Sequence, residues 1–364
     1  MSDKKVNGKK KRIRKEDLPS FLEHLGRERL LVGPVDTGKV IEYRRVTTPG
    51  AAATPDKPAT SGEVPTPQKL ATSGAATAAN ILTDDRVSYK SVKEFYFPHS
   101  ELMFTFENGE ATDSADIKGY AIFGAKPCDL EALRVMSIVY TTGKYADPFF
   151  QKRFEANLLI GVGCIEQKNG CFCHEMGIDR KFSDFCDIML IDDGENYIVE
   201  HLSEKGRLTL KSCSATRDIE CDNKRETAAP EGIKLALDVK KEDAAYFDII
   251  DWYKTTATCK GCGICTYICP TCYCFDFKDI AEKGVARRYK CWDSCIYPKF
   301  TLHASGHNPR AKRHERYRQR VLHKYKYVPD IYDGCVACTG CGRCVRSCPV
   351  GINIKDIVKQ ILLK

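Results

Sequence analysis

The apolar positions near the start of the chain predict a short helix followed by two strands. Leucine and phenylalanine side chains over residues 18–25 recur at the spacing of one helix face, which predicts an amphipathic helix. Apolar runs at residues 30–32 and 40–46 predict two strands, and the Asp-Thr-Gly sequence at residues 36–38 is typical of the turn between them.

Two longer apolar runs predict the buried strands of an α/β domain. Residues 120–124 form the first run, which is followed by a helical pattern up to Met136, and residues 158–164 form the second. Alternating strands and helices predict an α/β (or α+β) N-terminal domain, which we place at residues 17–225. Further strand-like segments lie at residues 188–191, 197–199 and 208–210. A helix is expected over residues 244–254, after this domain.

Two segments lack the apolar residues that a folded core requires. Residues 1–16 are rich in Lys and Arg without an aromatic residue between them, so we expect a basic disordered tail rather than a nucleic-acid-binding arm. Residues 47–80 consist mostly of Ala, Thr, Pro, Ser and Gly. Such a segment buries too little surface to offset its ordering entropy, and we expect a disordered insert within the domain.

The most regular pattern in the chain is made by cysteines. Residues 259–270 have the sequence Cys-Lys-Gly-Cys-Gly-Ile-Cys-Thr-Tyr-Ile-Cys-Pro, and residues 338–349 repeat the same cysteine spacing before a proline. This is the bacterial ferredoxin spacing for [4Fe–4S] clusters. A pair of zinc sites is the alternative, but zinc usually takes two separated pairs of cysteines. The two runs therefore predict two [4Fe–4S] clusters.

In a two-cluster ferredoxin the fourth cysteine of each run ligates the cluster of the other run. The predicted ligands of the first cluster are Cys259, Cys262, Cys265 and Cys348. Those of the second cluster are Cys338, Cys341, Cys344 and Cys269. Crossed ligation ties the two runs together. It predicts a bacterial-type 2[4Fe–4S] ferredoxin-like domain over residues 226–364, with a long insertion at residues 271–334.

Other cysteines offer two candidate sets for a third cluster. The set that we favour follows the two buried strands of the α/β domain and consists of Cys128, Cys164, Cys171 and Cys173. Ligand sites of α/β domains lie beyond the carboxyl ends of strands, so these thiols are expected to converge in one loop region. A rival set lies in the insertion and consists of Cys272, Cys274, Cys291 and Cys295. The alternative for both sets is that they are ordinary buried thiols.

Composition indicates where the protein works. The 364 residues include 20 cysteines, and the formal net charge is +8. The N-terminus lacks the apolar segment of a signal peptide, and no run of apolar residues is long enough to span a bilayer. We therefore expect a cytoplasmic protein in an oxygen-poor cell, with its cysteines reduced or bound to metal.

The most basic stretch outside the N-terminus covers residues 306–326, and a helix is expected there after Pro309. It is a candidate for nucleic-acid binding, with Tyr317 and Tyr325 as the stacking residues. It is equally a candidate for docking an acidic partner or for balancing the charge of the clusters. Because it lies between the two cysteine runs, we do not favour nucleic acid.

Several blocks of this sequence resemble the iron–sulfur β subunit of cytoplasmic NiFe hydrogenases (sulfhydrogenases) and the corresponding iron–sulfur subunit of anaerobic sulfite reductase. The blocks lie at residues 126–130, 147–150, 171–173, 259–276, 292–295, 306–310 and 338–351. The Pro-Thr-Cys-Tyr-Cys-Phe-Asp, Trp-Asp-Ser-Cys and Gly-His-Asn-Pro-Arg sequences among them are more specific than the ferredoxin runs. The resemblance implies an electron-relay subunit between a flavin, NAD(P)- or ferredoxin-linked partner and a catalytic subunit. It also favours a third cluster.

The sequence predicts no catalytic residues. No Gly-x-Gly-x-x-Gly sequence follows a predicted strand, and no nucleophile–base pair is indicated. We therefore expect a non-catalytic electron-transfer subunit of a multi-subunit redox complex. Two alternatives stay open: an oxidoreductase with its own flavin or substrate site, and an iron–sulfur regulator that binds nucleic acid through residues 306–326.

Overall fold

The computed structural model describes residues 10–47, 76–83, 86–113, 117–219, 235–238 and 240–364. The N-terminal part is built on a nine-stranded sheet with the strand order β11-β1-β10-β9-β8-β7-β2-β3-β4. These strands are β1 (Lys10–Arg14), β2 (Leu30–Asp36), β3 (Ile41–Thr47), β4 (Ala76–Thr77), β7 (Tyr120–Ala125), β8 (Leu158–Val162), β9 (Ile188–Asp192), β10 (Asn196–His201) and β11 (Arg217–Ile219). The four central strands β2, β7, β8 and β9 are parallel, and antiparallel strands flank them.

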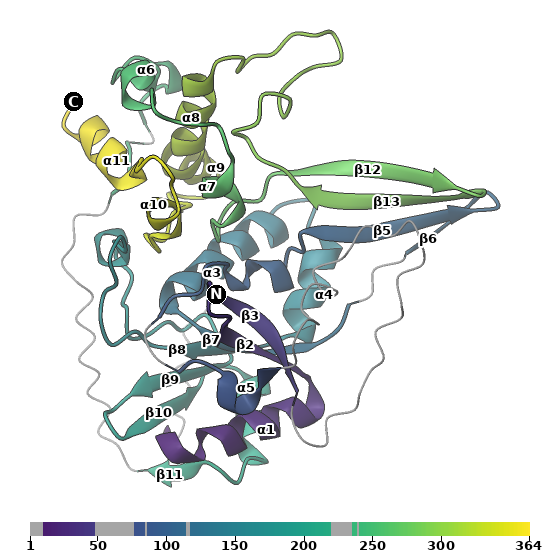
Figure 1. The fold of residues 1–364 in the computed structure, drawn as a ribbon, viewed down its shortest axis with the longest axis vertical. Helices are drawn as coiled ribbons and strands as arrows, with labels where there is room; N and C mark the ends of the chain where they lie inside the picture. The colour runs from purple at the N-terminus through teal and green to yellow at the C-terminus, as the bar shows by residue number, and fades with distance from the viewer. Residues whose placement is uncertain (1–9, 48–75, 84–85, 114–116, 220–234, 239) are drawn as a thin grey trace.

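Helices cover both faces of the large sheet, as expected for parallel strands joined by helices (Figure 1). They are α1 (Leu18–Glu28), α3 (Pro127–Thr141), α4 (Pro148–Ala156) and α5 (Glu204–Lys211). Alternate residues of the central strands face two separate cores: Phe123 packs with α1, whereas Ile122 packs with α3. The N-terminal region is thus a mixed α/β structure, and the amphipathic helix predicted at residues 18–25 is confirmed.

Three sequence-based expectations for this region are wrong. Residues 10–14 are not part of a disordered tail but form β1, because Ile13 is fully buried and the strand pairs with β10. Residues 76–77, at the end of the expected insert, form β4, which pairs with β3. Residues 208–210 lie in helix α5 and not in a strand, since Ser203 caps a helix that starts upstream of this short apolar segment. The remaining residues of the tail (1–9) and most of the insert (48–75) lie outside the described residues.

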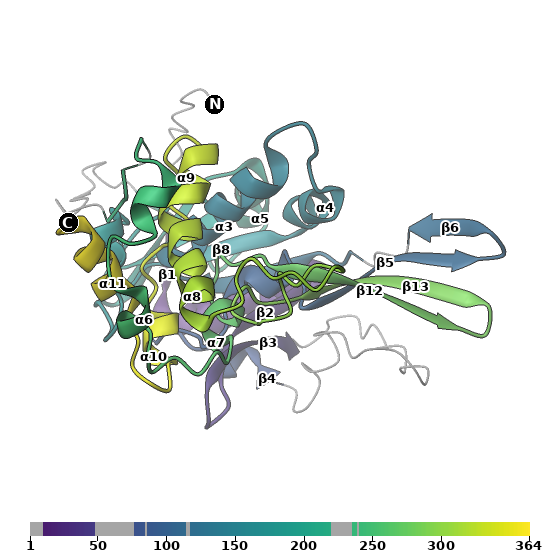
Figure 2. The same ribbon diagram turned by 90° about the horizontal axis from the view of Figure 1, so that it is seen from above.

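A second sheet projects from the body of the molecule as an arm (Figures 1 and 2). Its four antiparallel strands have the order β12-β13-β5-β6. They are β5 (Ser100–Glu107), β6 (Glu110–Asp113), β12 (Phe275–Glu282) and β13 (Val285–Trp292). The hairpin β12–β13 belongs to the insertion between the two cysteine runs, and β5–β6 belongs to the N-terminal region. The insertion therefore shares a sheet with the N-terminal region instead of forming a separate unit.

The C-terminal part consists of short helices around one apolar core that includes Trp252, Tyr325 and Val358. The helices are α6 (Trp252–Thr255), α7 (Ile264–Tyr267), α8 (Arg313–Leu322), α9 (Val328–Ile331), α10 (Arg343–Arg346) and α11 (Ile354–Leu362). A π-helical turn at His323–Tyr327 joins α8 to α9. The helix expected over residues 244–254 is replaced by a 3-10 turn at Asp243–Tyr246 and by α6, so that prediction is only partly right.

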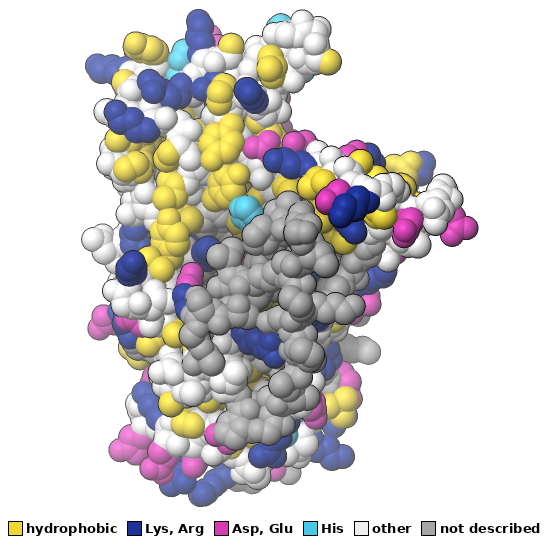
Figure 3. Space-filling view, turned by 45° about the vertical axis from the view of Figure 1, so that its right-hand side comes forward, with side chains coloured by type: hydrophobic (Ala, Val, Ile, Leu, Met, Phe, Trp, Pro, Cys, Tyr) yellow, Lys and Arg dark blue, Asp and Glu magenta, His cyan; other side chains and the backbone are white. Residues whose placement is uncertain are grey.

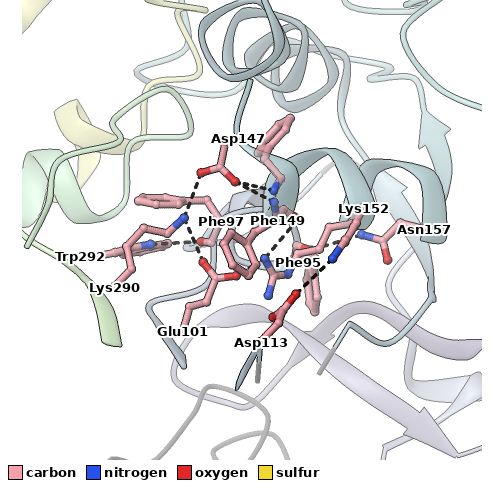
Figure 4. A network of polar contacts seen from close by, with 12 residues as sticks. Phe95, Phe97, Glu101, Asp113, Asp147, Phe149, Lys152, Asn157, Lys290 and Trp292 are labelled. Carbon is pink, nitrogen blue, oxygen red and sulfur yellow. Dashed lines mark hydrogen bonds and ion pairs between the residues drawn. The ribbon is translucent and has the colours of Figure 1, made fainter. Parts of the chain in front are cut away.

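A buried polar network fastens the arm to the N-terminal region (Figure 4). The Nζ atom of Lys290, on β13, lies 3.0 Å from Glu101 Oε2 on β5 and 3.1 Å from Asp147 Oδ2 at the start of α4. Arg153 of α4 also pairs with Glu101. Next along β13, the indole of Trp292 donates to the carbonyl oxygen of Phe97 at 3.1 Å. Because Lys290 pairs with carboxylates of both β5 and the start of α4, the network holds the hairpin against the N-terminal region.

We predict that Lys290→Met destabilises the protein by about 3 kcal/mol, because it leaves the two carboxylates of the network with a single cation, Arg153. Chemical unfolding followed by circular dichroism measures the change. Arg288→Met is the matched control, because Arg288 lies on the same strand but pairs with Asp279 at the surface. Its unfolding midpoint should stay close to that of the wild type. Equal effects of the two substitutions would show that the network does not fasten the arm.

Candidate metal centre

Cysteines from both ferredoxin-type runs line one cavity in the C-terminal region. Its cysteines are Cys269, Cys338, Cys341 and Cys344. These are three residues of the second run and the last cysteine of the first, which is the set that crossed ligation predicts for the second cluster. The residues present therefore fit a [4Fe–4S] cluster, whose ligands are cysteine thiolates.

The two runs have matching local structure. In each run a glycine with positive φ precedes a short helix: Gly263 (φ 74°) begins α7 and Gly342 (φ 72°) begins α10. α7 and α10 pack against each other. Glycine adopts this left-handed conformation without steric cost, so each run turns sharply between its second and third cysteines. The equivalent turns place the two runs side by side.

The predicted ligands of the first cluster lie around α7. Burial raises the pKa of Cys265 to about 11, and this thiol lies within electrostatic range of Cys259. Backbone N–H groups donate to two of the sulfur atoms, from Gly261 to Cys259 at 3.4 Å and from Ile352 to Cys348 at 3.3 Å. N–H···S bonds of this kind stabilise thiolate sulfur. Cys262 is exposed. The place of Cys348 in this set stays a prediction.

Three buried cations surround the cysteines. Arg320, Lys324 and Lys93 are each at most 3% exposed. Lys324 donates to Thr271 Oγ1 at 2.7 Å, and Arg320 donates to the carbonyl oxygen of Cys265 at 3.2 Å. Within the described residues none of the three pairs with a carboxylate, and the Nε and Nη1 atoms of Arg320 have no hydrogen-bond partner.

The cysteine sulfur atoms supply the negative charge that no carboxylate provides to these cations. Burial by itself lowers the pKa of Arg320, but the neighbouring Cys265 and Cys344 outweigh burial and raise it well above its ordinary value. Burial lowers the pKa of Lys93 to about 8. An unpaired buried charge is costly, whereas a thiolate-ligated cluster is anionic. The charge distribution therefore fits the clusters that the cysteine spacing predicts.

The structure brings the favoured third set together as two pairs. Cys128, at the start of α3, lies within electrostatic range of Cys164, and Cys171 lies within range of Cys173. Both pairs border the second cysteine run, since Cys128 interacts with Cys341 and the thiol of Cys171 lies 3.4 Å from the Cys341 carbonyl oxygen. A cluster held by all four stays a prediction.

The rival set, in the insertion, is not brought together as a whole. Three of its members line a second cavity: Cys272, Cys274 and Cys295. The fourth, Cys291, lies on β13, and its thiol is 3.5 Å from Ser100 Oγ. The sequence contained a signal for this cavity, because the Cys-Tyr-Cys sequence at residues 272–274 directly follows the first run. Its partner Cys295 is more than twenty residues away and is brought close only by the β12–β13 hairpin.

The basic stretch at residues 306–326 forms α8 as predicted, but its side chains do not suit base stacking. Tyr317 and Tyr325 are buried in the C-terminal core. Arg316 is buried as well and donates to the carbonyl oxygen of Ile296 at 2.8 Å. This arrangement favours the charge-balancing interpretation of the stretch over nucleic-acid binding.

A loop of the N-terminal region packs tightly on the second run. A Cβ atom built on Gly342 would lie 2.4 Å from the carbonyl oxygen of Gly170, and one on Gly340 would lie 2.6 Å from the backbone of Phe172. The Phe172 N–H donates to the Gly340 carbonyl oxygen at 2.7 Å. Next to it, Arg343 forms a buried bidentate pair with Asp129 of α3, at 2.7 and 2.8 Å. The second run is thus held in place by the N-terminal region.

We predict that Gly342→Ala lowers both iron content and thermal stability, because the new methyl group would collide with the Gly170 backbone. Gly351→Ala is the control: it has a similar φ (70°) but nothing within 4 Å of the added atom. The control should lose only about 1–2 kcal/mol of folding stability, which is what a left-handed conformation costs an L-residue. Iron analysis and thermal unfolding measure the difference, and equal behaviour of the two variants would contradict the tight packing.

Comparisons with known proteins identify a cluster-binding domain in the C-terminal part of the chain. Residues 258–352 match the model of the 4Fe-4S dicluster domain, which implies two [4Fe–4S] clusters. Sulfhydrogenase 2 subunit beta of Pyrococcus furiosus is 29% identical over 281 residues, which cover 74% of this chain and 82% of that protein. No solved structure matches the chain significantly. None of the described helices is long and apolar enough to cross a bilayer. The chain is a 4Fe-4S dicluster domain protein related to sulfhydrogenase 2 subunit beta.

Proposed function

We propose that this chain is the iron–sulfur electron-transfer subunit of a cytoplasmic multi-subunit redox complex. It relays electrons between a flavin, NAD(P)- or ferredoxin-linked partner and a catalytic subunit of the hydrogenase or sulfite-reductase type. The observation that carries the proposal is the cavity in which Cys269 of the first run meets three cysteines of the second beside buried Arg320 and Lys324. The relationship to a sulfhydrogenase beta subunit favours a hydrogenase as the catalytic partner.

The environment of the cysteines suits electron transfer. Reduction adds negative charge to a cluster, and buried cations and N–H···S bonds stabilise that charge. Arg320 and Lys324 supply the cations, and the N–H groups of Gly261 and Ile352 supply the hydrogen bonds. These groups tune the potentials of the clusters without taking part in bond chemistry.

The ligand assignment within this proposal is crossed. One cluster is held by Cys259, Cys262, Cys265 and Cys348, and the other by Cys338, Cys341, Cys344 and Cys269. The set Cys128, Cys164, Cys171 and Cys173 is kept as a proposed site for a further cluster, since both of its pairs border the second run.

The arm offers a surface for a partner subunit. β12 is the edge strand of the four-stranded sheet and is exposed along nearly its whole length. Phe275 and Phe277 on this strand are 37% and 49% exposed. Hydrophobic and charged side chains lie together on the arm in Figure 3. Exposed edge strands with aromatic side chains are typical of protein interaction surfaces.

Crossed ligation makes Cys348→Ser a decisive variant. It should alter the electron paramagnetic resonance signal of the cluster held by Cys259, Cys262 and Cys265, and leave the signal of the cluster in the Cys338 cavity unchanged. Cys335→Ser is the control, because Cys335 precedes the second run and belongs to neither ligand set. If the Cys338 cluster changes instead, each run ligates its own cluster and the crossed assignment is wrong.

The electron-transfer role is tested with the anaerobically purified chain. We expect dithionite to reduce its clusters, and a co-purified flavoprotein or catalytic subunit to reoxidise them. The isolated chain should show neither flavin absorbance nor turnover with artificial dyes. Flavin together with dye-linked turnover would show that the chain is an oxidoreductase with its own substrate site. Salt-dependent retention on DNA by the iron-loaded chain would favour a regulator instead.

A further inference from the structure

A second cavity lies beside the one that the dicluster cysteines line. The two cavities are similar in size. Three further cysteines line it: Cys272, Cys274 and Cys295. The two cavities share three lining residues, which are Thr271, Arg320 and Lys324. Two cavities of similar size, each lined by several cysteines, therefore adjoin each other across these three side chains.

The fold holds these three thiols at the cavity through the hairpin of the arm. The hairpin returns the chain from Cys274 to Cys295, and the N–H of Asp293 donates to the Cys274 carbonyl oxygen at 2.9 Å. The thiols of Cys274 and Cys295 lie within electrostatic range of each other. Cys272 lies within range of Cys269, which lines the first cavity. Two segments that are distant in sequence thus supply thiols to one site.

The second cavity is also positively charged. Arg320 is 2% exposed and lines both cavities, and its Nε and Nη1 atoms have no hydrogen-bond partner among the described atoms. Lys324, 3% exposed, also lines it, and Lys93 lies next to it and donates to the carbonyl oxygen of Cys272 at 3.0 Å. A buried guanidinium with two unused donor atoms requires an anionic partner. Because Arg320 lines both cavities, a thiolate-ligated cluster in the second cavity adds to the negative charge that the dicluster cysteines supply.

An imidazole completes the donor set. His323, in the π-helical turn after α8, lines the same cavity. Its Nε2 atom lies 3.1 Å from the hydroxyl oxygen of Tyr273, which holds the ring in place. Three thiolates and one imidazole are ligands that iron–sulfur clusters and zinc both accept.

We propose that Cys272, Cys274 and Cys295, with His323 as the fourth donor, hold an additional [4Fe–4S] cluster in the second cavity. The inference rests on the proposed function, because a cluster beside the first cavity extends the electron path towards the base of the arm. The spacing of the donors favours iron–sulfur over zinc. A lone zinc ion needs all its donors within about 2.0–2.3 Å of one point. In the described residues no three His, Cys, Asp or Glu side chains are grouped closely enough to hold a single metal ion.

The test is iron, acid-labile sulfide and zinc per chain after anaerobic reconstitution of the full-length protein. We expect Cys272→Ala/Cys295→Ala to hold about four irons fewer than the wild type, at four irons per cluster. The wild type should hold about twelve irons from the dicluster pair and this cluster, and about sixteen if the N-terminal set binds a cluster as well. Cys291→Ala is the matched control, since this neighbouring thiol points to Ser100 and should leave the iron count of the wild type unchanged. His323→Cys should retain the iron and alter the electron paramagnetic resonance signal of one cluster.

Three outcomes would overturn the proposal. About eight irons in the wild type, unchanged in the double variant, would mean that the three cysteines are buried thiols. One zinc lost with the double variant would make the site a zinc site. A loss of four irons in Cys128→Ala/Cys173→Ala, with none in Cys272→Ala/Cys295→Ala, would assign the extra cluster to the N-terminal set.

Two further controls keep the result decisive. Should the double variant fail to fold, native mass spectrometry of Cys128→Ala/Cys173→Ala, which lacks the N-terminal set, decides. Three clusters in that protein support the proposal, and two overturn it. A wild type without any iron would instead refute the dicluster function itself. The failure of the additional cluster is therefore distinguishable from the failure of the electron-transfer role.

Discussion

Positive charge buried beside cysteine sulfur is the constraint on which the C-terminal region depends. Arg320 and Lys324 lie in the interior, and in the described residues they contact carbonyl and hydroxyl oxygens but no carboxylate. Such an interior is unfavourable unless an anion occupies the adjacent cavity. Both side chains come from the segment that begins with α8, whose aromatic residues form the surrounding core. This segment therefore both packs the C-terminal core and supplies the positive charge that balances the clusters.

The same constraint explains why the N-terminal and C-terminal regions interlock. The second cysteine run has little regular structure of its own, and its glycines allow the backbone at Gly170 and Phe172 to approach it closely. Arg343, which lies between two of the run's cysteines, is neutralised by Asp129 of the N-terminal region. On the opposite side, the arm sheet joins the insertion to β5. A cluster site built from loops thus gains its rigidity from a sheet and helices outside it.

An electron carrier benefits from this construction. Small changes in solvation and hydrogen bonding shift the potential of an iron–sulfur cluster, so a rigid, mostly buried surrounding keeps the potential constant. The arm extends away from this rigid centre and exposes an edge strand (Figure 2). The cysteine-lined cavities thus lie in the interior, whereas the arm exposes an edge strand.

The sequence alone determined the two cysteine runs, their [4Fe–4S] chemistry and the α/β character of the N-terminal region, because these depend on local spacing and periodicity. It also predicted that Cys269 would join the second run, which follows from the crossed topology of two-cluster ferredoxins. It did not reveal that Ile13 anchors a strand in a basic segment or that residues 208–210 are helical. Short segments take the structure that their neighbours impose. Only the tertiary structure grouped Cys272, Cys274 and Cys295 around one cavity, since the β12–β13 hairpin and its pairing with β5 decide which distant thiols meet.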